Sequence, residues 1–163
     1  MRHVRESLPD DVAKTVACSI VGTIIDYCNA LLVGMADSNF NKLQRLQNTL
    51  ARVVLRLRKF DHITPALMEL HWLPVKHRVT FKLATLTFKT MQFGQPTYLR
   101  DLVKFYDPVR TLRSSSKRLL CLDRCRTVVA TRSFKHSSAT IWNSLPVDIR
   151  DSNTIDLKLT CLN

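Results

Sequence analysis

Glycine is scarce in this chain, with three residues among 163. The phosphate-binding loops of P-loop and dinucleotide-binding proteins need several glycines at fixed spacings, because the backbone must approach the phosphates closely. No such pattern occurs in the sequence. A phosphate-cradling loop of either type is therefore excluded.

Long apolar runs are also missing. The longest uncharged apolar run extends from Thr15 to Ile25, well short of the roughly 20 residues that a membrane-spanning helix needs. Glu6, Asp10 and Asp11 follow soon after two arginines, which is not typical of a signal or transit peptide. Five cysteines, an odd number spread widely along the chain, indicate reduced thiols. We therefore expect an intracellular protein, nuclear or cytoplasmic, that is not secreted and has no membrane partner.

Residue patterns that support catalysis are absent. A polymerase needs paired carboxylates at a tight strand turn to hold two divalent cations, and the one adjacent pair, Asp10 and Asp11, is better explained by capping a helix start. Cys121 and Cys125 have a spacing that zinc ligands can adopt, but no second Cys/His pair follows at a regular distance. Cys28 is expected in a helix among apolar neighbours, an environment that does not activate a thiol. We expect no catalytic residue, metal, cofactor or small-molecule substrate, and hence no enzyme.

Positive charge is what the chain has in excess, with a formal net charge of +12. Acidic residues outnumber basic ones up to Asp37, so the remainder carries the whole excess. This distribution favours a polyanion as partner, usually RNA or DNA, over an anionic membrane surface. The alternative is a solvated basic surface without a specific partner.

The hydrophobic pattern predicts a mainly α protein, a multi-helix bundle of about five to six helices with a small β-hairpin near residues 118–131. The expected helices run from about Asp10 to Val33, Ser38 to Lys59, Thr64 to His71, Leu73 to Phe93, Thr97 to Phe105 and Arg132 to Ser144. The first is apolar around most of its circumference, which predicts burial on several sides. Residues 1–106 are expected to form a helical bundle, 107–150 a basic loop, hairpin and helix packed on it, and 151–163 a weakly ordered tail, in one domain.

Basic residues follow the expected helices in stripes. The second helix carries Lys42, Arg45, Arg52, Arg56 and Lys59, roughly 120° away from its apolar face by the helical period. The fourth helix adds Arg78, Lys82 and Lys89, and the loop region adds Arg110, Arg113, Lys117 and Arg118, followed by Arg124, Arg126, Arg132 and Lys135. These residues are the candidate nucleic-acid-binding set. Contacts from such stripes to successive phosphates carry little sequence information, and their affinity falls steeply with salt.

Three other residues have a structural interpretation. We expect Asp26 to be a buried or half-buried carboxylate that pairs with an arginine from another helix. Trp72, beside His71, and Trp142 lie next to proline turns. Either could stack on a base, but anchoring the core is the more usual role of a tryptophan beside a proline turn.

Three strings resemble one family in order and spacing. They are IDYCNALLVG from Ile25 to Gly34, LQRLQNTLARVV from Leu43 to Val54, and KFDHITPALMELHWLPVKHR from Lys59 to Arg78. They resemble the region just after the polymerase domain in reverse transcriptases of non-LTR (LINE-type) retrotransposons of the jockey and chicken-repeat kind. RTLRSSS at Arg110 and RSFKHSSATIWNSLPVDIR at Arg132 continue the likeness, which covers nearly the whole chain.

The resemblance implies a non-catalytic C-terminal fragment of an RNA-directed DNA polymerase that contacts template RNA or primer phosphates. The missing polymerase domain would be a further partner, since the family's motif of two aspartates is absent here. Two alternatives remain open. One is a decayed retrotransposon relic without selected activity, which the start at Met1 within the resemblance and the final residues DLKLTCLN favour. The other is a helical protein-interaction module that uses apolar helix faces.

Overall fold

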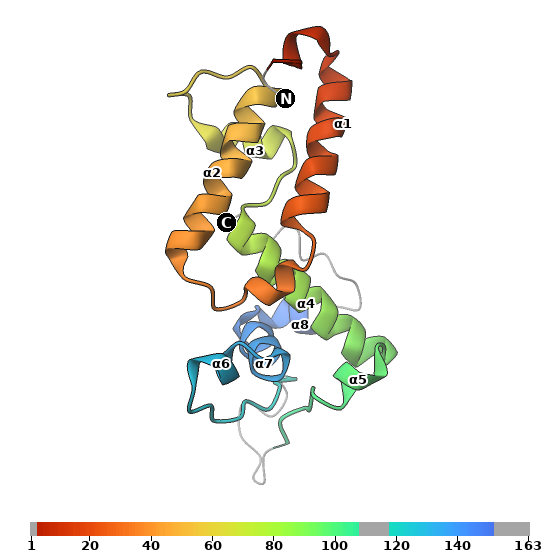
Figure 1. The fold of residues 1–163 in the computed structure, drawn as a ribbon. Helices are drawn as coiled ribbons and strands as arrows, with labels where there is room; N and C mark the ends of the chain where they lie inside the picture. Colours follow the sequence, from red (N-terminus) through yellow and green to blue (C-terminus); the bar gives the residue numbers. More distant parts are fainter. Residues whose placement is uncertain (1–2, 108–117, 152–163) are drawn as a thin grey trace. The chain divides into compact units, whose positions relative to one another are not determined.

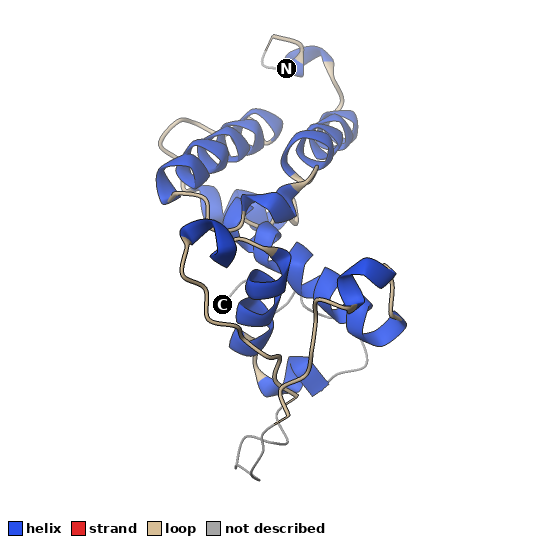
Figure 2. Ribbon diagram, turned by 60° about the horizontal axis from the view of Figure 1, so that its bottom comes forward, coloured by secondary structure: helices blue, strands red, loops and turns tan. Residues whose placement is uncertain are grey.

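The computed structural model describes residues 3–107 and 118–151. The fold is mainly helical, as the sequence predicts, and the described residues contain no β-strand (Figure 2). None of the helices in these ranges is long and apolar enough to cross a membrane. The chain divides into two compact units, Met1–Arg78 and Val79–Asn163, which we call unit 1 and unit 2 and describe separately. The prediction of one domain with its main break at residue 107 stays a prediction.

Unit 1 is built around two helices that lie side by side (Figure 1). Its elements are a 3₁₀ turn at Arg5–Ser7, α1 at Asp10–Ile20, a π turn at Val21–Ile25, a 3₁₀ turn at Asn29–Leu32, α2 at Asp37–Val54, α3 at Ile63–Glu69 and the first turn of α4 at Val75–Phe93. Ala13 and Ala17 of α1 and Ala51 of α2 have no exposed surface. Small side chains let helix axes approach closely, so these alanines account for the tight packing.

The first helix is shorter than the sequence predicts. It is expected to continue to Val33, but the α-helical part ends at Ile20 and the chain turns at Cys28, whose φ of 51° is left-handed. A right-handed helix cannot pass through such a residue. At this turn Asp26 Oδ2 accepts a hydrogen bond from Arg78 Nη1 at 2.5 Å, which confirms the expected ion pair. Cys28 is exposed at the turn, so its expected place inside a helix is wrong.

The predicted burial of the first helix on several sides is also wrong for the described residues. The buried side carries Ala13, Ala17, Val21 and Ile25. The exposed apolar residues of this segment are Val12, Val16, Ile24, Tyr27 and Leu31, with exposed fractions from 38% for Val12 to 81% for Leu31. Val12 and Val16 belong to α1, and the other three lie in the turns that follow it. We call these five residues the N-terminal apolar set.

Buried amides join α2 to the start of α4. Gln47 is 1% exposed, and its Nε2 donates to the Leu73 carbonyl at 2.8 Å. Gln44 Oε1 accepts from Val75 N at 2.9 Å, which satisfies one of the backbone donors that every helix leaves unpaired in its first turn. Trp72 lies beside this junction and is 4% exposed. It is therefore a core residue, as the sequence indicates.

Unit 2 has a small core centred on a tryptophan. It contains the rest of α4, α5 at Thr97–Arg100, α6 at Val128–Thr131, α7 at Phe134–Ser144 and α8 at Val147–Asp151. Phe88, Leu120, Ala139 and Trp142 form its buried apolar cluster, with 6.5 Å between the ring centroids of Phe88 and Trp142. Trp142 is thus a core anchor, which confirms the structural interpretation.

The hairpin expected near residues 118–131 is wrong. Leu120 forms only an isolated antiparallel bridge with Phe105, and the second predicted strand is the helical turn α6. Thr127 explains this turn, because its side-chain oxygen accepts from Ala130 N at 3.2 Å. An N-cap of this kind satisfies a donor that the helix cannot pair itself.

The side chain of Asn143, and not a second strand, forms the hydrogen bonds to the backbone of Leu120. Its Oδ1 accepts from Leu120 N at 2.9 Å, and its Nδ2 donates to the Leu120 carbonyl at 3.0 Å. We expect Asn143→Ala to lower the free energy of unfolding by about 2 kcal/mol, because it leaves two part-buried backbone groups unpaired. Urea denaturation checks this value. Thr140→Ala, at an exposed position of the same helix, is the control and should change stability by no more than about 0.5 kcal/mol. Equal effects of the two substitutions would contradict the assigned role.

Candidate nucleic-acid interface

The C-terminal end of α2 and the turns near it line a groove of about 790 Å³ in unit 1. Thr49, Val53 and Leu57 form its uncharged lining, and its charged lining residues are Arg5, Glu6, Arg52, Arg56 and Lys59. We call it the basic groove, since it holds four cations and one carboxylate. Three of the cations, Arg52, Arg56 and Lys59, belong to the stripe that the sequence predicts.

A left-handed residue shapes the groove at the end of α2. Arg56 has a φ of 53°, and Leu57 N donates to the Arg52 carbonyl at 2.9 Å. This bond closes the helix end in the way that a glycine usually does. The chain turns there, and Lys59, which follows the turn, lines the same groove as Arg52.

Arg5 neutralises the end of α2. It is 5% exposed. Its Nε and Nη2 donate to the Val54 carbonyl at 2.9 and 2.7 Å, and its Nη1 donates to the Leu8 carbonyl at 3.0 Å. The C-terminal end of a helix carries partial negative charge, which repels anions. The charge of Arg5 offsets this repulsion, so an anion can bind in the groove. Arg5 itself is not expected to bind the anion, because its donors are already in hydrogen bonds.

Asp10 is the acidic partner of Arg5 at 2.5 Å. The hydrogen bond from Arg5 and the charge of Arg5 lower the pKa of Asp10 below its ordinary value, more than burial raises it, and the charges of Arg56 and Lys14 lower it further. Arg56 Nη2 lies 3.8 Å from the same carboxylate oxygen. Both side chains are largely exposed, and surface pairs of this kind are weak. Arg56 therefore remains able to bind another anion.

The two remaining cations, Arg52 and Lys59, have N–H donors that are not used in hydrogen bonds. Arg52 makes one hydrogen bond, from Nη2 to the Asp61 carbonyl at 3.3 Å, and its Nε is buried without an acceptor among the described residues. A guanidinium has five N–H donors. The buried Nε is out of a ligand's reach, so the donors that Arg52 can offer are those of its two Nη atoms that the bond to Asp61 does not use. Lys59 Nζ lies 5.8 Å from the centre of the exposed Phe60 ring. Neither cation is paired with a described carboxylate.

The other predicted residues of unit 1 lie outside the groove. Lys42 and Arg45 are exposed on α2 but do not line it. Arg78 is occupied by Asp26, and its Nε also donates to the Leu73 carbonyl at 2.9 Å. Its side chain is 14% exposed. We therefore leave Arg78 out of the candidate interface.

The remaining predicted residues belong to unit 2 or fall outside the described chain. Lys82 and Lys89 are exposed on α4, and Arg118, Arg124, Arg126 and Arg132 are exposed after it. Lys135 pairs with Asp123, and this hydrogen bond and the opposite charges raise the pKa of Lys135 and lower that of Asp123. Arg110, Arg113 and Lys117 lie outside the described residues. No three His, Cys, Asp or Glu residues in the described ranges gather as a metal site would require.

Arg5 and Glu6 are the charged residues of the basic groove that the sequence does not predict. Arg5 is 49 residues from Val54, and no local pattern connects them. Its only sequence signal is a position just before the helix start at Pro9.

Comparison with models of protein families, with curated proteins and with solved structures found no match. The likeness to LINE-type reverse transcriptases therefore depends on the sequence strings alone. The basic groove is the feature of the described residues that indicates a function.

Proposed function

We propose that unit 1 binds the phosphate backbone of nucleic acid through the basic groove. The observation that carries this proposal is the convergence of Arg52, Arg56 and Lys59, three cations with free donors, on one groove. Guanidinium groups match the oxygen atoms of a phosphate with two parallel hydrogen bonds. A strand passing over the groove would place successive phosphates against them.

Binding in this groove would not depend on base sequence. Among the described residues that line it, none has an aromatic side chain on which an unpaired base could stack. Contacts to phosphates position a nucleic acid but carry no sequence information. They release counterions, so the affinity should fall steeply with salt.

The family resemblance fits this role. It would make the chain the non-catalytic, post-polymerase part of a LINE-type RNA-directed DNA polymerase, which supports template RNA or primer while another domain copies it. The charge excess beyond Asp37 and the groove support the proposal independently of the resemblance.

Fluorescence polarisation tests the proposal with labelled RNA, single-stranded DNA and duplex DNA at several salt concentrations. We expect binding of all three, with affinities that decrease strongly with salt. Variants of the groove, described in the Discussion, assign the binding to these residues. A decayed relic would instead unfold over a broad range of denaturant and bind as any polycation does, independently of the groove.

The N-terminal apolar set favours a second candidate function, a protein-interaction module. Its most exposed members are Ile24, Tyr27 and Leu31, at 69%, 78% and 81%. Exposed apolar patches are typical of interaction surfaces. Under this candidate the chain self-associates at high concentration, and Ile24→Ser with Leu31→Ser restores the monomer, as light scattering after size exclusion would show.

A matched control is Leu46→Ser, because Leu46 is also exposed, at 64%, but belongs to α2. It should leave the association unchanged. A monomer at all concentrations, or equal effects of the two variants, would remove the self-association form of this candidate.

A further inference from the structure

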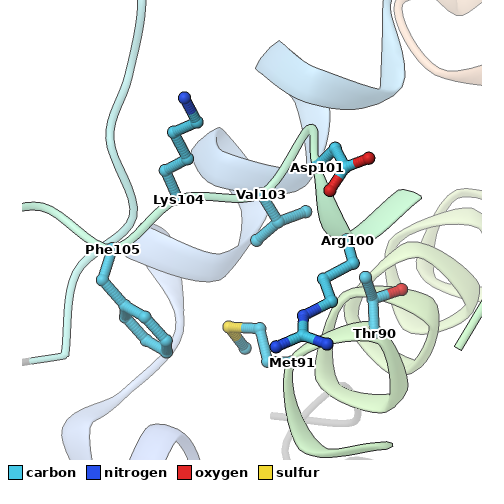
Figure 3. Close-up of a pocket in the computed structure, with 7 residues that line it drawn as sticks. All are labelled: Thr90, Met91, Arg100, Asp101, Val103, Lys104 and Phe105. Atoms are coloured by element: carbon cyan, nitrogen blue, oxygen red, sulfur yellow. The ribbon is translucent and has the colours of Figure 1, made fainter. Parts of the chain in front are cut away.

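Unit 2 contains a pocket with both aromatic and charged lining. It has a volume of about 470 Å³ and lies between the C-terminal part of α4 and residues 100–105 (Figure 3). Met91, Val103 and Phe105 supply its apolar lining, and its polar lining residues are Thr90, Arg100, Asp101 and Lys104. We call it the aromatic pocket. Its size falls within the roughly 300–1,000 Å³ of small-ligand sites.

The apolar side of the pocket is held by the core of unit 2. Met91 and Val103 pack against the cluster that contains Phe88 and Trp142. Phe105 is fixed through its backbone by the bridge to Leu120, while its side chain is 51% exposed. An exposed aromatic ring on a fixed backbone is a preformed surface for stacking a flat group.

Arg100 is directed into the pocket. Its guanidinium extends toward Met91 and Thr90 (Figure 3) and makes no hydrogen bond or ion pair with another described residue. Gly94, at a φ of 65°, leaves room for it, because a Cβ there would lie 3.3 Å from Arg100 Nη1 and 3.5 Å from its Cδ. The pocket therefore pairs a free planar cation with the ring of Phe105.

A carboxylate completes the lining. Asp101 is exposed, and its two carboxylate oxygens can accept hydrogen bonds from a ligand. Thr90 is 1% exposed and its Oγ1 donates to the Leu86 carbonyl at 2.8 Å, so it closes the pocket and does not bind the ligand. A ligand for this pocket would need a flat apolar face, N–H donors and an anionic group.

We infer that the aromatic pocket takes one unpaired nucleotide of a nucleic-acid strand. The base lies against Phe105 and Met91, its N–H groups donate to Asp101, and its phosphate binds Arg100. Only a base outside a duplex exposes the face that stacks on an aromatic side chain. A simple aliphatic acid would leave the acceptors of the pocket unpaired. The inference goes beyond the basic groove, which belongs to unit 1 and contacts phosphates alone.

The experiment titrates the full chain with adenosine 5′-monophosphate, adenosine, ribose 5-phosphate and inorganic phosphate, using saturation-transfer NMR and calorimetry. We expect the nucleotide to bind most tightly, with saturation transferred to its base protons. Phe105→Ala should weaken its binding about tenfold, the scale of one lost base–aromatic stack, and Phe105→Trp should preserve it. Arg100→Gln should weaken binding of the nucleotide but not of adenosine.

Two control variants come from the same unit. Phe93→Ala removes an aromatic ring that is 68% exposed and does not line the pocket. Lys82→Gln removes an exposed cation of α4 that does not line the pocket. Both should bind the nucleotide as the unchanged chain does.

Three results would each overturn the inference: no nucleotide binding, equally tight binding of ribose 5-phosphate or inorganic phosphate, or full binding by a folded Phe105→Ala variant. The groove variant with Arg52, Arg56 and Lys59 replaced should keep its adenosine binding. The two proposals can therefore fail separately.

Discussion

Replacing Arg52, Arg56 and Lys59 together by glutamine is expected to lower the affinity for duplex DNA about 100-fold at about 0.1 M salt. These three residues are the cations of the basic groove that have unused donors. Each phosphate contact contributes about 0.9 to the negative slope of log affinity against log salt. The triple variant should therefore show a slope that is smaller by about 2.7. Fluorescence polarisation at several salt concentrations measures both quantities.

A control with the same charge separates the groove from the general charge of the chain. Replacing Lys42, Arg45 and Arg58 by glutamine removes three exposed cations of unit 1 that do not line the groove. We expect this control to lose less than about tenfold in affinity, because screened charges act weakly at a distance. Equal losses in both variants would mean that the chain binds only as a polycation. Far-UV circular dichroism of both variants establishes that they are folded.

Arg5→Met is expected to lower the free energy of unfolding by about 3 kcal/mol, the scale for removing one partner from a buried charged network. Arg5 is buried and donates to the carbonyls of Val54 and Leu8 and to Asp10. Methionine fills a similar volume but cannot donate. The Val54 carbonyl then lies unpaired at the negative end of α2. Urea denaturation of the full chain, followed by far-UV circular dichroism, measures the loss.

Arg58→Met is the matched control for this substitution. Arg58 is exposed in the same unit, and its replacement should change stability by no more than about 0.5 kcal/mol. Similar effects of Arg5→Met and Arg58→Met would show that the buried network does not stabilise unit 1.

The pair of Arg5 and Asp10 also implies a direction for the effect of pH. The folded-state pKa of Asp10 lies below its unfolded value of 3.8. A carboxylate of this kind stabilises the fold above pH 3.8, and its contribution is lost as the pH falls through the folded-state pKa. Asp10→Asn should remove this acid-dependent part and leave the bonds from Arg5 to Val54 intact.

The helices with strong periodicity could be predicted from the sequence. The expected helices from Ser38, Leu73 and Arg132 correspond to α2, α4 and α7, with ends that differ by a few residues. Apolar residues at helical spacing are local signals, so they remain informative without knowledge of the tertiary structure. Shorter segments were less predictable. The apolar, partly β-branched residues 127–131 resemble a strand, but the side chain of Thr127 caps a helical turn there.

The basic groove was predictable only in part. The stripe expected on a helix to Lys59 includes Arg52, Arg56 and Lys59, but α2 ends at Val54. The turn at Arg56, and not helical spacing, brings Arg56 and Lys59 to the groove. The contribution of Arg5 depends on a contact between residues 49 positions apart. The aromatic pocket was not predicted at all, since it depends on how the segment with Phe105 folds back toward Met91 of α4.

The sequence by itself determined the helical class, the excess of positive charge and the helices that carry it, because composition and periodicity are properties of neighbouring residues. Only the tertiary structure decided which cations remain available to a ligand. Arg78 pairs with Asp26, and Arg5 binds the end of α2, whereas Arg52 keeps unused donors. A charge becomes available or occupied through its neighbours in space, and those neighbours come from distant parts of the chain.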